Sequence, residues 1–116
     1  MRLATVKYNN AEIAGVVTSK GVLPIAALNE AEGTSYKTDM MSLIQAGEIP
    51  AMTAWYNAGG KAKLEDMAGL VPNDQVVYAP LYRNPKRIFG IGLNYVDHAG
   101  DIGSAAPTGF PGSFFK

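Results

Sequence analysis

The sequence predicts an α+β fold in which a small N-terminal β-meander is followed by two short helices. Three observations carry this prediction: β-branched runs separated by turn residues in the opening third, apolar residues at helical spacing in the middle, and a further apolar run near residue 90. The 116 residues are enough for one ordinary domain and too few for two. A chain of this length buries roughly two thirds of the surface that it exposes when unfolded, so it needs no disulfide to fold.

The opening third alternates strand-like runs with turn residues. Residues 2–8 have extended character, and Asn9–Asn10 supply short polar side chains that tolerate a left-handed turn. A second run covers residues 13–17 and a third covers residues 22–25. Pro24 favours a sheet edge for the third run, because proline lacks a backbone N–H. These runs together predict the meander.

The middle of the chain predicts two short helices. Residues 40–44 place apolar side chains at i, i+3 and i+4, with Asp39 in the first turn, and Gly47 is placed to end this helix. The second helix begins at Pro50 and repeats the same apolar spacing up to Gly59–Gly60. Residues 61–70 extend this helical region by a short piece at most.

The remaining chain predicts two more strands and a linker. Residues 75–78 follow an Asn–Asp turn and favour a strand, whereas residues 80–85 contain two prolines and show no periodicity. Residues 87–93 form a run of bulky apolar residues that is typical of a buried strand. The sequence therefore predicts a boundary close to residue 80, with parts 1–80 and 81–116.

Composition excludes several classes of function. Ten basic and ten acidic residues leave no positive surplus, so nucleic acid is not expected as a partner. The absence of cysteine excludes disulfides and thiolate metal sites. The first ten residues hold no apolar leader, and no run of about 18 apolar residues occurs, so neither secretion nor a membrane partner is expected. The expectation is a cytoplasmic protein.

The single histidine is the first candidate for chemistry. His98 follows the apolar run, and Asp101 comes three residues later. In a helical turn these two side chains share a face, so the carboxylate could orient the imidazole as a general base that takes a proton from water. The spacing alone also fits a surface or capping histidine.

Other candidate motifs favour structural roles. The pair Gly90 and Gly92 lacks the third glycine of a dinucleotide fingerprint. Glu65 and Asp66 are adjacent and expected to be solvated, and the chain offers no convergent set of metal ligands. Trp55 and Tyr56 are expected to be core and interface anchors. The basic cluster at residues 83–87 is expected to be a solvated face, and the alternative is a surface that steers an anionic substrate.

The C-terminal stretch leaves two interpretations open. Its last seven residues hold Phe110, Phe114 and Phe115 and end on Lys116, with no later residues to cover the three rings. These rings could dock on the domain's own core. Alternatively, a second domain that would bury them is missing and the chain is truncated.

Residues 87–99, together with Pro111 and the Phe114–Phe115–Lys116 ending, closely resemble the opening of the catalytic domain of the fumarylacetoacetate hydrolase family. Residues 1–80 resemble in layout the small N-terminal domain found in many bacterial members, several of them labelled 2-hydroxyhepta-2,4-diene-1,7-dioate isomerases or acylpyruvate hydrolases. The resemblance implies that residues 81–116 are the first strand and lid segment of a truncated, β-rich catalytic domain.

The resemblance also implies a chemistry. Members are hydrolases or isomerases that use a divalent metal, usually Mg, on 2-oxo acids or β-diketo acids. Their reactions are C–C bond hydrolysis, decarboxylation or enol isomerisation, as in aromatic catabolism. By position, His98 is the base, Asp101 stands where the family usually has Glu, and Lys116 is the substrate-binding lysine that polarises a carbonyl.

The family's metal ligands would lie after Lys116, so no metal site is expected in this chain, which is predicted to be inactive alone. A homodimer is the expected assembly. Two other readings stay open: a non-catalytic interaction or dimerisation module that uses the phenylalanines as its contact, and an unrelated domain whose match is chance.

Overall fold

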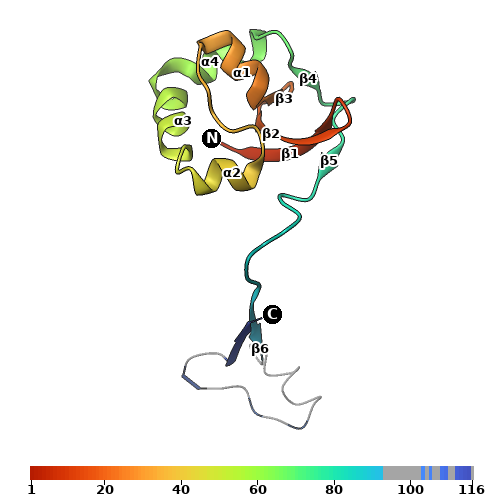
Figure 1. Ribbon diagram of the computed structural model, residues 1–116, viewed down its shortest axis with the longest axis vertical. Coiled ribbons are helices and arrows are strands. Elements are labelled where there is room, and N and C mark those ends of the chain that lie inside the picture. Colours follow the sequence, from red (N-terminus) through yellow and green to blue (C-terminus); the bar gives the residue numbers. More distant parts are fainter. Residues whose placement is uncertain (93–102, 104, 106–107, 110–111, 116) are drawn as a thin grey trace. The chain divides into compact units, whose positions relative to one another are not determined.

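A computed structural model describes residues 1–92, 103, 105, 108–109 and 112–115 (Figure 1). It divides the chain into two compact units, Met1–Arg83 and Asn84–Lys116. The predicted α+β class is confirmed, because the first unit combines an antiparallel sheet with helices. The family identity of the two parts stays a prediction.

The first unit is built on a five-stranded antiparallel sheet with strand order β4-β3-β2-β1-β5. Its strands are β1 (Leu3–Tyr8), β2 (Ala11–Val17), β3 (Gly21–Pro24), β4 (Val71–Pro72) and β5 (Tyr78–Ala79). The first three strands pair in chain order and form the predicted meander. The two short strands β4 and β5 come from the end of the unit and form the two edges of the sheet.

The β1–β2 hairpin turns at Asn9 and Asn10, which adopt φ values of 46° and 61°. Asparagine is one of the few side chains that tolerates this left-handed region, and a two-residue turn with positive φ matches the twist of the flanking strands. The register runs from Leu3 opposite Val16 to Tyr8 opposite Ala11. The Asn–Asn signal in the sequence therefore fixes this hairpin.

The predicted edge position of the third strand is wrong. Strand β3 lies between β2 and β4. Strand β4, however, pairs only with Gly21 and Val22, so the ladder on that side ends before Pro24 and does not need its missing N–H. The strand also ends at Pro24, because Ile25 begins a helix instead of extending the strand.

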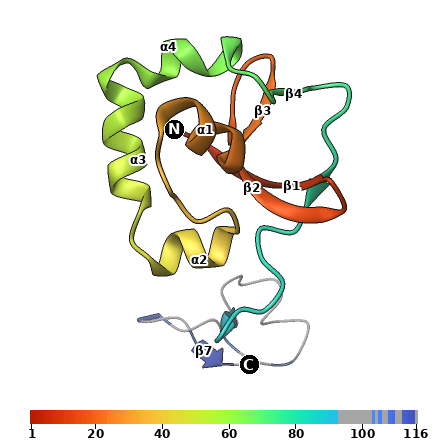
Figure 2. The same cartoon turned by 45° about the horizontal axis from the view of Figure 1, so that its top comes forward.

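The prediction of two short helices is incomplete. The predicted pair corresponds to α2 (Met40–Gln45) and α3 (Ile49–Trp55), but α1 (Ile25–Glu32) precedes them. After α3 the chain continues through a turn that is kinked at Gly59, η1 (Tyr56–Gly60), then α4 (Lys61–Lys63) and a 3₁₀ turn, η2 (Leu64–Asp66). In the two views the helices lie along one side of the curled sheet (Figure 2).

The helix ends follow the sequence signals. Asp39 is the N-cap of α2, where its side chain accepts a hydrogen bond from the Ser42 backbone N–H at 2.9 Å. The Ser42 side chain, followed by this backbone bond, holds the pKa of the Asp39 carboxyl below its ordinary value. Gly47 follows α2 with φ 68°, and Pro50 lies in the first turn of α3, where a missing N–H costs nothing.

The core lies between the sheet and the helices. Strands β2 and β3 contribute apolar side chains, and each of α1, α2, α3 and η2 adds at least one. The buried apolar cluster comprises Ala14, Val16, Leu23, Ile25, Leu28, Met40, Leu43, Met52 and Leu64. Trp55 and Tyr56 are half-buried and pack against this cluster, as expected for anchors at its border.

The strand predicted over residues 75–78 is shorter and later than expected. Only Tyr78 and Ala79 pair with β1, and Gln75 and Val76 instead donate their backbone N–H groups to the Pro72 carbonyl. Two-residue strands such as β4 and β5 carry no periodic pattern, so their pairing is set by the sheet edges that they meet.

In the second unit, β6 (Phe89–Gly92) pairs antiparallel with β7 (Gly112–Phe115). The predicted strand is confirmed, but its predicted burial is wrong, since Phe89 and Ile91 are 57% and 55% exposed. The described residues of this unit form only a two-stranded ribbon, which has no second layer to cover its faces. Phe110 and Lys116 lie outside the described residues. The two interpretations of the C-terminal phenylalanine rings, docking on the chain's own core or burial by a missing domain, therefore stay predictions.

The substitution Gly21→Ala tests the β3–β4 pairing. A Cβ atom at this position would lie 2.0 Å from the Val71 carbonyl oxygen, which is rigid backbone. We expect a loss of about 2–3 kcal/mol in the free energy of unfolding, the upper range for overpacking, measured by urea denaturation. Gly109→Ala is the matched control, since no atom of the described residues lies within 4 Å of its Cβ position. Equal stability of the two variants would contradict the close approach.

Candidate functional site

One cleft of about 820 Å³ opens in the first unit between the β2–β3 turn and the helical segment that follows α3. This volume falls within the range of small-molecule sites, roughly 300–1,000 Å³. The β-sheet side supplies Arg2, Val17, Thr18 and Ser19, and the helical side supplies Tyr56, Asn57, Gly59, Lys61, Ala62, Leu64 and Glu65. The cleft is therefore a candidate ligand site.

The helical wall is shaped by the kinked turn η1. Gly59 adopts φ 118°, a value that a side chain strongly disfavours, and the helix resumes immediately after it. The chain is therefore kinked at Gly59, between two helical segments. Tyr56, Asn57 and Gly59 of this turn all line the cleft.

Trp55 packs against this turn and connects it to α1. A Cβ atom at Gly60 would lie 2.6 Å from the Trp55 ring, so only glycine permits this contact. The Trp55 indole N–H donates to a Glu32 carboxylate oxygen at 3.0 Å, and Lys63 Nζ lies 3.1 Å from the other. These two contacts, led by the indole bond, hold the pKa of Glu32 below its ordinary value.

The opposite wall is the β2–β3 turn. The Thr18 N–H donates to the Gly21 carbonyl at 2.8 Å, while the Thr18 hydroxyl oxygen accepts from the backbone N–H groups of Lys20 and Gly21 at 3.2 and 3.1 Å. Such side-chain bonds to the following backbone replace bonds that a longer strand would supply. The turn is thus internally closed and presents Ser19 outward.

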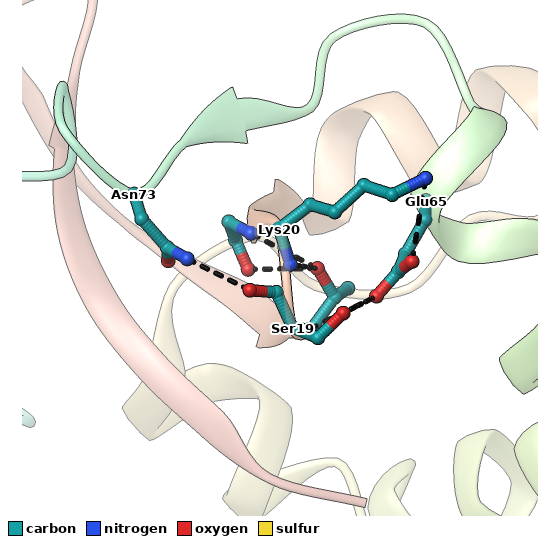
Figure 3. Close-up of polar contacts among 6 residues, drawn as sticks. Ser19, Lys20, Glu65 and Asn73 are labelled. Atoms are coloured by element: carbon teal, nitrogen blue, oxygen red, sulfur yellow. Dashed lines mark hydrogen bonds and ion pairs between the residues drawn. The ribbon is translucent and has the colours of Figure 1, made fainter.

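Glu65 joins the two walls (Figure 3). The Ser19 backbone N–H donates to Glu65 Oε1 at 3.0 Å and the Ser19 hydroxyl donates to the same oxygen, while Lys20 Nζ lies 3.5 Å from Oε2. On the other side of the turn, Asn73 Nδ2 donates to the Ser19 carbonyl at 2.8 Å. Four residues from three separate parts of the chain therefore meet at this turn.

These contacts set the charge state of Glu65. The hydrogen bond from the Ser19 hydroxyl contributes most to lowering the pKa of Glu65 below its ordinary value, and the Ser19 N–H and the Lys20 ammonium add to it. At neutral pH the group is an ionised acceptor and not a proton donor. The expectation that Glu65 is merely solvated is wrong, because the turn supplies donors that no local pattern reveals.

The cleft also presents two cations without a counter-charge. Within the part of the chain that the structure describes, Arg2 and Lys61 form no ion pair, whereas Lys20 is paired with Glu65. Two positive groups and one already engaged carboxylate suit the binding of an anion better than proton transfer.

The residues expected to carry catalysis, His98, Asp101 and Lys116, lie outside the described residues, and their roles stay predictions. Among residues 1–92 and the few described after them, no group of three His, Asp or Glu side chains gathers as for a metal ion. None of the described helices is long and apolar enough to cross a bilayer.

The basic cluster at residues 83–87 is a surface feature with one defined pair. Arg83 binds Glu12 through two hydrogen bonds, Nε to Oε2 at 3.0 Å and Nη2 to Oε1 at 2.6 Å. The bonds lower the pKa of Glu12 and raise that of Arg83. Lys86 and Arg87 are exposed, in agreement with a solvated face.

The cleft was not predicted from the sequence. The paired Gly59 and Gly60 were interpreted as a helix end, although two adjacent glycines also permit a distorted turn that continues. Contacts between residues 19 and 65, which are 46 positions apart, leave no local signal.

Comparisons of the chain with protein-family models, with curated proteins and with solved structures give no match. Assignment of a function therefore depends on the chain's own residues and on the motif at residues 87–99.

The substitution Glu65→Gln tests the charged link between the walls. Because the folded-state pKa of Glu65 is lowered, its charge adds stability above the unfolded pKa of about 4.3, and this is lost as pH falls through the folded value. We expect wild type to unfold at a higher temperature than Glu65→Gln at pH 7, and the gap to close on acidification below about pH 4.

Glu30→Gln is the control for the change in net charge. Glu30 is an exposed glutamate of α1 that takes part in no ion pair among the described residues. A gap between wild type and Glu65→Gln that stayed constant from pH 7 to the acid range would contradict the role of the Glu65 charge.

Proposed function

We propose that this chain is the N-terminal portion of a divalent-metal-dependent hydrolase or isomerase that acts on 2-oxo acids or β-diketo acids. The observation that carries the proposal is the run of residues 87–99, together with the Phe114–Phe115–Lys116 ending, which resembles the start of the catalytic domain of the fumarylacetoacetate hydrolase family. Its chemistry would be C–C hydrolysis, decarboxylation or enol isomerisation.

The pairing of β6 with β7 supports this proposal. The two parts of the motif are more than ten residues apart in the sequence, yet Phe89 lies opposite Phe115 and Gly92 opposite Gly112. Gly92 and Gly112 are therefore neighbours in one ribbon, and they flank the stretch of sequence that contains His98 and Asp101.

In this proposal His98 is the general base. Its imidazole takes a proton from water, the resulting hydroxide adds to the carbonyl carbon distal to the carboxylate, and the C–C bond then breaks to leave an enolate that is protonated. Asp101 stabilises the imidazolium, and Lys116 binds an anionic oxygen of the substrate. A divalent metal would polarise the 2-oxo acid end, and the described residues do not supply its ligands.

A His98→Ala variant of the full-length enzyme tests the catalytic role. First, the reading frame is sequenced beyond the codon for Lys116, and the proposal expects it to continue into a domain rich in Glu and Asp ligands. In that protein, with Mg and acetylpyruvate, we expect His98→Ala to lower kcat by about 10²–10⁴-fold, the contribution of a positioned base.

Two outcomes would contradict the proposal. One is a stop codon directly after Lys116, and the other is an unchanged kcat in His98→Ala. The 116-residue chain itself, assayed under the same conditions, serves as the negative control and should turn over no more substrate than its own His98→Ala variant.

A non-catalytic interaction or dimerisation module is the second candidate, and one observation favours it. Seven of the eight exposed large apolar side chains among the described residues lie between positions 77 and 91. They are Val77, Tyr78, Leu81, Tyr82, Ile88, Phe89 and Ile91. Val77, Tyr78, Leu81 and Tyr82 belong to the first unit, and a group of exposed apolar side chains such as theirs is typical of a surface that contacts another protein.

The backbone of the first part of this segment is held in place. Lys7 N–H donates to the Val77 carbonyl at 2.8 Å, and the buried Thr5 hydroxyl donates to the Leu81 carbonyl at 2.7 Å. The apolar side chains of residues 77–82 are therefore presented from an ordered segment, which lowers the entropy cost of binding.

The double substitution Leu81→Ser/Tyr82→Ser tests the module. If this surface mediates self-association, light scattering after size exclusion should show a dimer for the 116-residue chain and a monomer for the double variant. Ile44→Ser, which removes an exposed large apolar side chain outside the segment, is the matched control and should stay dimeric. A monomeric wild-type chain would contradict self-association.

A further inference from the structure

We propose that the cleft between the β2–β3 turn and residues 56–65 binds a small organic carboxylate with an apolar body. The carboxylate would contact Arg2 and Lys61, and the apolar body would lie against Val17, Tyr56 and Ala62. Every lining residue belongs to the first unit, so this inference does not depend on the proposed catalytic role of His98.

Charge selects the class of ligand. The lining holds two cations and one carboxylate, and the carboxylate of Glu65 already accepts from Ser19 and pairs with Lys20. Arg2 and Lys61 form no ion pair with the residues that the structure describes. An anion entering the cleft would gain charge-assisted hydrogen bonds from both cations without displacing an existing partner.

The remaining lining selects for an apolar body. Val17 and Tyr56 are half-buried and Leu64 is 1% exposed, so the lining includes apolar side chains that are largely withdrawn from water. Asn57, Thr18 and Ser19 add hydrogen-bonding groups to the lining. Apolar side chains with a few polar groups are the composition of small-molecule sites, whereas phosphate alone would leave the apolar side chains uncovered.

The kink at Gly59 shapes the helical side of the cleft. Glycine adopts φ 118° without the steric cost that a side chain would bring, so the chain can change direction here between α3 and α4. No described atom lies within 4 Å of a Cβ built at Gly59, so this position opens onto free space. The kink places Tyr56, Asn57 and Gly59 on the cleft.

Titration of the ¹⁵N-labelled 116-residue chain with benzoate and hexanoate tests the site. We expect saturable shifts of the backbone amide signals of Ser19, Asn57, Gly59 and Lys61. Benzamide has the size of benzoate without its charge, and we expect its affinity to be at least about tenfold weaker, as for loss of a charge-assisted bond. Saturable binding of benzamide as tight as that of benzoate would overturn the carboxylate assignment.

Two kinds of variant locate the site. Arg2→Gln/Lys61→Gln removes both cations and should raise the Kd for benzoate about tenfold or more. Ala62→Phe fills part of the cleft without changing its charge and should weaken hexanoate and benzoate alike. Lys37→Gln, at an exposed lysine outside the cleft, is the matched control and should bind as wild type does.

Melting temperatures confirm that each variant is folded before titration. Should either altered variant fail to fold, the other decides the result. The proposal is overturned if neither carboxylate gives a saturable shift, or if a folded variant of either kind binds both carboxylates as tightly as Lys37→Gln does.

Discussion

The β2–β3 turn, residues 18–21, is the connection on which the rest of the first unit depends. Its Gly21 allows the backbone of Val71 to approach more closely than any side chain would permit, and this approach attaches β4 to the sheet. The same turn receives Asn73 on one side and Glu65 on the other. One four-residue turn therefore determines the position of the sheet edge and of the segment that forms the helical wall of the cleft.

Apolar burial and polar contact have different roles at this junction. Full burial of a leucine such as Leu64 contributes about 1.5–3 kcal/mol, whereas the exposed ion pair Lys20–Glu65 is screened by solvent and adds little. The burial of Leu64 thus decides that η2 packs on the sheet. The hydrogen bonds from Ser19 decide how the neighbouring Glu65 is oriented, and so which charges remain available in the cleft.

Sequence reasoning was most successful where the signal is local. The Asn9–Asn10 turn, the N-cap at Asp39 and the glycine at position 47 each specify their own backbone conformation, and the strands and helices beside them were predicted. Helix α1 was missed because Pro24 and Ile25 continue the apolar character of β3, so the strand pattern concealed the start of the helix.

The cleft could not be predicted, because its walls are related only by packing. No periodicity connects Ser19 with Glu65, and a two-residue strand such as β4 has no pattern of its own. The expected burial of residues 87–93 failed for a related reason: apolar character specifies that a run should be covered, but not which part of a protein covers it.

Under either candidate function, the exposed apolar side chains of residues 77–91 need to be covered. Seven large apolar side chains in contact with water lose the free energy that their burial would provide, about 25 cal/mol for each Å² covered. In the enzyme proposal a further domain provides the cover, and in the module proposal a second copy does. The two candidates therefore differ in what covers the segment, not in the need for a cover. Because the cleft of the first unit uses none of these residues, its ligand site is compatible with both.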